Sequence, residues 1–137
     1  MRFRFCLNMP KVEVTVTGVK DLQAQFKNTE SKLVRNLQSA LKVSASLSEK
    51  KMKQLTPIDT GNLHRSVEAN YSNLKNFEVT IGPDINVAYY APFVEYGHHT
   101  RAGNFIPGQY FIRRTVTAMT PIITNIMNEA VSKSLKP

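Results

Sequence analysis

Apolar and polar side chains recur along the first part of the chain with periods typical of one strand and one long helix. Residues 12–17 alternate strictly between valine and polar side chains, which predicts a half-buried strand. Between Val19 and Leu55 there is no proline or glycine, and apolar residues recur at three-, four- and seven-residue steps. This spacing predicts a helix of about 35 residues. The weak helix formers of Ser44–Ser48 mark the place where so long a helix could break.

The second part of the chain predicts a hairpin and another helix. Pro57 ends the first helix because it disfavours helical geometry in the residue before it. Ser66–Tyr71 and Phe77–Ile81 each alternate and are joined by a short polar segment, which indicates an antiparallel pair. Gly97–Asn104 is polar and reads as an exposed loop. An apolar stripe over about residues 109–135 predicts a helix, in which Pro121 marks a kink or a break.

The order of these elements indicates an α+β fold. We expect a small antiparallel sheet packed with a long N-terminal helix and a C-terminal helix. The 137 residues fit a single domain over 1–137. Residues 1–9 show no periodicity and are expected to be a flexible or non-native extension, with translation starting at Met1 or at Met9. Asp59 or Thr60 is expected to cap a short helix or a turn after Pro57.

Composition excludes several classes of protein. With 42% hydrophobic and 20% charged residues, the chain fits neither a disordered protein nor a coiled-coil rod. No apolar run approaches the roughly 20 residues that span a bilayer, and the N-terminus lacks the apolar core of a signal peptide. The single cysteine, Cys6, forms no internal disulfide, and no Cys/His spacing indicates zinc. We therefore expect no metal, no cofactor and no membrane partner.

The net charge of +8 lies mainly in the first part of the chain. Residues 1–56 carry 11 basic and 4 acidic side chains, whereas residues 57–137 carry 7 and 6. Such an excess is typical either of contact with nucleic acid or an acidic protein, or of a helix with solvated lysines. Lys50, Lys51 and Lys53 are the candidate contacts for DNA or an acidic partner. A small basic nucleic-acid-binding protein is thus one reading of the residues.

Candidate catalytic groups are few. Glu95, His98 and His99 lie close in sequence, but adjacent histidines point in different directions on most backbones and no further acidic or histidine cluster completes a site. An exposed polar loop is the competing interpretation. The preceding aromatic segment, Tyr89–Tyr96, has no period that buries all its rings, so it forms core, a protein–protein surface, or both.

Three segments together resemble a family of tailed-bacteriophage neck proteins. They are Thr56–Ser66, with Pro-Ile-Asp-Thr-Gly-Asn-Leu; Tyr90–Gly97, with Tyr-Ala-Pro-Phe-Val-Glu-Tyr-Gly; and Gln109–Thr115, where the second helix begins. Members are described as head–tail joining or tail-completion proteins of long, non-contractile-tailed phages and related prophages. The ordered triplet carries the resemblance, which covers about residues 10–135. His98–Arg101 departs from the small residues usual in the family at that loop.

The resemblance implies a structural, non-enzymatic protein of the virion neck, assembled in the host cytoplasm. It implies a homo-oligomeric ring, expected to be a hexamer, that contacts head connector or head-closure proteins and tail tube or tail terminator proteins. Non-specific contact with DNA in the channel is a further expectation. The candidate interface residues are Asp59, Thr60, Gly61, Leu63, Tyr90, Phe93, Glu95, Tyr96, Gly97, Phe111 and Arg113.

Overall fold

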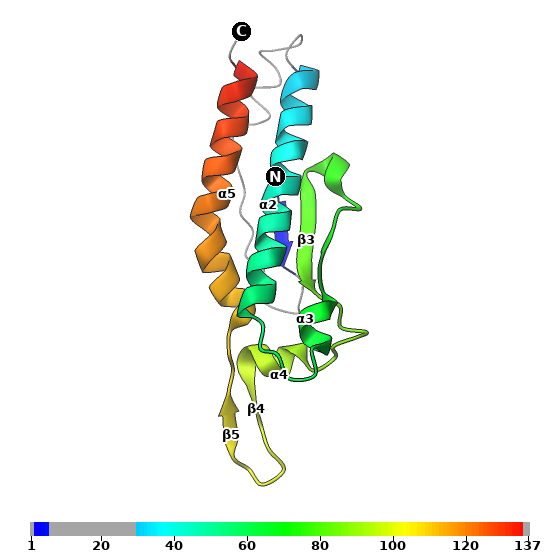
Figure 1. The fold of residues 1–137 in the computed structure, drawn as a ribbon, viewed down its shortest axis with the longest axis vertical. Helices are drawn as coiled ribbons and strands as arrows, with labels where there is room; N and C mark the ends of the chain where they lie inside the picture. Colours follow the sequence, from blue (N-terminus) through cyan, green and yellow to red (C-terminus); the bar gives the residue numbers. More distant parts are fainter. Residues whose placement is uncertain (1, 6–29, 136–137) are drawn as a thin grey trace.

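The computed structural model describes residues 2–5 and 30–135, and its largest feature is a pair of long helices. Helix α2 (Glu30–Leu55) and helix α5 (Phe111–Leu135) lie side by side and run in opposite directions (Figure 1). Near the C-terminal end of α5, the side-chain amide of Asn36 donates to the Ser134 hydroxyl at 2.9 Å. The predicted strand at 12–17 and the first part of the predicted first helix lie outside the described residues.

Helix α2 follows the predicted stripe without a break. Its buried residues are Leu33, Leu37, Ala40, Leu41, Ser44, Ala45, Ser48 and Met52. The serines do not interrupt the helix: Ser44 and Ser48 are both fully buried, and the Ser48 hydroxyl donates to the Ser44 carbonyl at 2.8 Å. The helix ends just before Pro57, where the Thr56 hydroxyl donates to the Met52 carbonyl at 2.7 Å.

Helix α5 begins close to the predicted position and continues past Pro121 to Leu135. Pro121 lies on the exposed side of the helix, so its ring meets solvent and the buried stripe is left intact. The residues on that stripe are Phe111, Ile112, Thr115, Met119, Ile123, Met127, Ala130 and Ser134. Pro121 therefore does not divide the C-terminal segment into two helices.

A three-stranded sheet packs against α2. Strand β3 (Glu78–Pro83) lies in the middle, with β2 (Val67–Asn70) antiparallel and β1 (Arg2–Phe5) parallel to it. The β2–β3 pair confirms the predicted hairpin, and the 3₁₀ turn η1 (Leu74–Asn76) connects its strands. Alternate residues of β3 are buried, as the period of two predicts. The parallel β1 makes this sheet mixed, which the sequence patterns did not predict.

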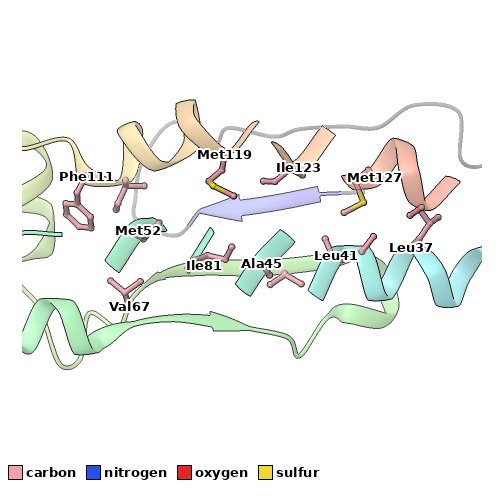
Figure 2. Close-up of a cluster of buried hydrophobic side chains, with 14 of the residues drawn as sticks. Leu37, Leu41, Ala45, Met52, Val67, Ile81, Phe111, Met119, Ile123 and Met127 are labelled. Atoms are coloured by element: carbon pink, nitrogen blue, oxygen red, sulfur yellow. The ribbon is translucent and has the colours of Figure 1, made fainter. Parts of the chain in front are cut away.

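The hydrophobic core lies between α5, α2 and the sheet. Figure 2 shows Met119 and Ile123 of α5 directed toward the space bounded by α2 and β1, with Ile81 of β3 on the other side of that space. Leu41 and Met52 of α2 are fully buried in the same cluster. Two helices and a small sheet around one core form the α+β fold that the sequence predicts.

The remaining elements gather at one end of the helix pair (Figure 1). They are α3 (Asn62–Ser66), α4 (Ala91–Tyr96), β4 (Gly97–His99) and β5 (Phe105–Pro107). Strands β4 and β5 form an antiparallel pair, with no further strand beside them among the described residues, and project away from the body of the molecule. The segment predicted as an exposed loop thus contains one strand of a hairpin, and its turn carries the exposed residues 101–104.

Candidate functional site: a groove and a projecting hairpin

The three sequence segments that carry the family resemblance meet at the end of the molecule opposite the C-terminus. The Pro57–Leu63 turn, the start of α4 and the residue Gln109 line one groove of about 580 Å³. The lining residues are Pro57, Asp59, Thr60, Gly61, Asn62, Leu63, Val87, Tyr89, Tyr90, Val94 and Gln109. Segments that lie far apart in sequence therefore form one surface feature, which we call the groove.

One wall of the groove is the turn that leads into α3. Gly61 precedes α3 with φ = 79°, a left-handed conformation that favours glycine, and its carbonyl accepts from the Arg65 amide at 3.0 Å. Helix α3 has no side-chain cap, so the expectation that Asp59 or Thr60 caps it is wrong. Both of those residues are exposed. Leu63 is buried and fixes the turn to the core.

Glu95 joins α4 to the start of α5. Its side chain is buried, and its two carboxylate oxygens accept from the backbone amides of Ile112 at 2.9 Å and of Arg113 at 3.1 Å. The first amides of a helix have no partner within the helix and carry partial positive charge, so a carboxylate stabilises them. Glu95 is thus a cap for α5 that is supplied by another helix of the same chain, α4.

The backbone next to Glu95 is held equally closely. The amides of Gln109 and Tyr110 donate to the carbonyls of Val94 and Glu95 at 2.8 and 3.1 Å. Tyr110 has φ = 51°, an uncommon conformation for a residue with a side chain, and it redirects the chain into α5. These bonds attach the base of the β4–β5 hairpin to the end of α4.

Exposed aromatic and aliphatic side chains surround the groove and cover the hairpin. The exposed fraction is 76% for Tyr89, 73% for Ile58 and 54% for Phe93. The others in this region are Ile85, Val87, Tyr96, Phe105, Ile106 and Tyr110. Burial, followed by the nearby Glu95 carboxylate, raises the pKa of Tyr96, whereas Arg113 lowers it. The Tyr96 hydroxyl therefore stays protonated near neutral pH and can donate.

The structure separates the three candidate catalytic groups. The Glu95 carboxylate is occupied by the amides of α5. His98 and His99 are adjacent on β4 and hence on opposite faces, where their rings pack against Phe93 and Phe105 at centroid distances of 6.0 and 5.1 Å. Among the residues described, no group of three or more His, Cys, Asp or Glu side chains could hold a metal ion.

The candidate DNA contacts lie in the last turns of α2. Lys50 is exposed and Lys51 half-buried, and neither forms an ion pair within residues 2–5 and 30–135. Lys53 binds Glu49 at 2.7 Å, so its charge is largely compensated. No helix in the described part of the chain combines the length and apolar character that a membrane crossing requires.

The predicted interface residues fall into two groups. Asp59, Thr60, Tyr90 and Phe93 lie at the surface or partly so, as do Tyr96 and Arg113. Leu63, Glu95 and Phe111 are buried, and Gly61 and Gly97 are half-buried, so these five support the surface from within. Tyr89 lay in the aromatic segment predicted as core or interface, but sequence reasoning missed Ile58, Phe105 and Ile106. The signal available for the last two was an apolar pair directly after a polar turn.

The family model described as "Bacteriophage HK97-gp10, putative tail-component" matches residues 20–97. The chain belongs to this HK97-gp10-like family, and this confirms the resemblance to tailed-phage neck and tail-completion proteins. It is therefore a protein of the virion. No curated protein and no solved structure matches the chain.

Proposed function

We propose that this tail component is a non-enzymatic subunit of the head–tail connector, which joins the head to the tail or completes the tail as part of an oligomeric ring. The observation that carries the proposal is the set of exposed apolar side chains around the groove and on the hairpin, among them Ile58, Tyr89 and Phe105. A group of exposed large apolar side chains of this kind is typical of protein–protein contact. A subunit of a closed ring needs two different, mutually complementary surfaces, and the groove and the hairpin differ in this way.

The proposal includes partners and a place in the particle. A neck ring, for which six subunits are expected, contacts head connector or head-closure proteins on one side and tail tube or tail terminator proteins on the other. The subunits are made in the host cytoplasm and enter the particle during assembly. Tail membership supports contacts with other virion proteins, and the exposed aromatic residues supply surface for them.

Deletion of the gene from the phage, followed by electron microscopy of the particles, tests this function. We expect filled heads and finished tails that remain unjoined. Closed heads with tails of uncontrolled length would assign the chain to tail termination. Normal infectious particles would overturn the structural role. Restoring the gene on a plasmid controls for effects on neighbouring genes.

A second candidate function is non-specific DNA binding, favoured by Lys50, which is exposed and forms no ion pair with the described residues, and by the nearby Lys51. Replacing both with glutamine is expected to weaken duplex binding and to reduce the slope of log affinity against log salt by about 1.8, since each phosphate contact contributes about 0.9. A filter-binding titration over a range of salt concentrations measures both. Lys133→Gln, in the last turn of α5, is the matched control. Equal slopes in the double variant and wild type would exclude DNA contact at these lysines.

A further inference from the structure

The β4–β5 hairpin, residues 97–107, has apolar side chains that are exposed in the described part of the chain; we call it the arm. Phe105 and Ile106 are adjacent on β5, so they lie on opposite faces of the arm, with exposed fractions of 57% and 46%. Within the described part of the chain, no third strand pairs with the arm. A two-stranded hairpin is at best marginally stable in water. The arm therefore gains stability when both faces pack against another surface.

The groove is a concave, mainly apolar surface to which the exposed apolar side chains of the arm can bind. It is concave, about 580 Å³ in volume, and walled mainly by apolar atoms of side chains such as Leu63, Val87 and Val94. A volume of this size is in the range of about 300–1,000 Å³ that ligand sites occupy. The arm does not reach the groove of its own chain, because its base is bonded to the end of α4 and its strands lead away from α3, which forms a wall of the groove (Figure 1).

The arm and the groove also carry opposite charges. Arg101 is the only charged residue of the arm and Asp59 the only charged residue that lines the groove. Both side chains are exposed, and neither forms an ion pair within residues 2–5 and 30–135. Complementary charges of this kind fix the register of an interface and disfavour wrong partners.

We propose that the arm of one subunit binds in the groove of a second copy of the same chain. Arm and groove are different surfaces, so the contact is head-to-tail and generates a ring where the rotation between subunits closes. The inference rests on the proposed ring and deepens it, because it names the two surfaces that meet. Arg101 of one copy then lies next to Asp59 of the next.

Disulfide trapping in assembled particles tests this contact. In a Cys6→Ser background, Phe105→Cys on the arm is combined with Asn62→Cys at the groove. Purified particles, mildly oxidised, are expected to show a ladder of cross-linked species on a non-reducing gel, from dimer upward, that collapses to monomer with reductant. Each single cysteine variant controls for random pairing. Phe105→Cys with Lys133→Cys, at the other end of the molecule, is the matched control and should give no ladder.

The outcomes separate this inference from the proposed function. A ladder supports the arm–groove contact. Monomers alone, in particles that contain the chain, overturn the contact and leave the neck role standing. Dimers without higher species also overturn it, because they indicate a two-fold contact. Absence of the wild-type chain from purified particles overturns the neck role itself.

If the cysteine pair keeps the chain out of particles, exchanging the charges of Arg101 and Asp59 tests the arm–groove contact instead. Arg101→Asp and Asp59→Arg are each expected to reduce phage titre about 10-fold or more, because each places like charges in contact. The double variant restores the pair and should recover most of the titre. Circular dichroism of the purified variants checks that they fold. Failure of the double variant to recover overturns the contact.

Discussion

Glu95→Ala is expected to lower the free energy of unfolding by about 3 kcal/mol. The substitution leaves the amides of Ile112 and Arg113 without their carboxylate acceptor at the buried start of α5. A hydrogen bond to a charged group contributes about 1.5–3 kcal/mol, and loss of a helix cap costs about 0.5–2 kcal/mol. These two estimates describe the same interaction and overlap, so they are not added. Urea unfolding of the full chain, followed by far-UV circular dichroism, measures the effect.

Two further variants make the assignment specific. Glu95→Gln keeps the shape and one acceptor oxygen but removes the charge, so we expect an intermediate loss of about 1–2 kcal/mol. Glu129→Ala removes a glutamate whose ion pair with Lys133 is largely exposed, and its effect should stay within about 0.5 kcal/mol. A Glu95→Ala protein as stable as the Glu129→Ala protein would show that the carboxylate does not stabilise α5.

Glu95 also explains why part of the site was predictable and part was not. The family resemblance placed it among the candidate interface residues, whereas the structure buries its carboxylate. The partner amides lie 17 and 18 residues after Glu95 in the sequence, and no local pattern reports a contact across that distance. Burial of the carboxylate follows only from the packing of α4 against the start of α5.

Elements with long periodic patterns were predictable because one face of each is buried. The stripe from Leu33 to Met52 and the alternation of β3 each report a core-facing surface. Strand β1 and the arm strands have four and three residues, too few to establish a period. The pairing of β1 with β3 is set by the tertiary fold. Elements with a long buried face could therefore be predicted from the sequence, and the short strands could not.

The groove belongs to the unpredictable part for the same reason. It exists because Pro57–Leu63, Tyr89–Val94 and Gln109 converge in space, and their order in the chain gives no measure of their separation. The sequence did identify two of the three segments as candidate interface regions. What it lacked was the exposure of Tyr89 and Phe105, which makes the end of the molecule a surface for assembly.

The geometry of the arm depends most on Gly97. Its φ of 89° is in the left-handed region that favours glycine, and a Cβ at this position would overlap the Ile106 carbonyl oxygen and approach the Gly108 amide nitrogen to 2.7 Å. Both obstacles are backbone atoms, one in β5 and one in the residue that follows it, and they cannot move without shifting the arm. A Cβ added at Gly108 would similarly overlap the backbone of Glu95 and Tyr96. The two glycines allow the base of the arm to lie against the end of α4.

Gly97→Ala is therefore expected to lower the free energy of unfolding by about 4 kcal/mol, through backbone strain of about 1–3 kcal/mol and overpacking of about 1–3 kcal/mol. Gly103→Ala is the matched control, because Gly103 has a similar φ of 84° but nothing within 4 Å of the added Cβ. That control should lose only about 1 kcal/mol. Urea unfolding of the two variants isolates the steric part, and equal losses would show that the arm is not held at its base by close packing. If the arm binds a neighbouring subunit, Gly97→Ala should also abolish the disulfide ladder while Gly103→Ala retains it.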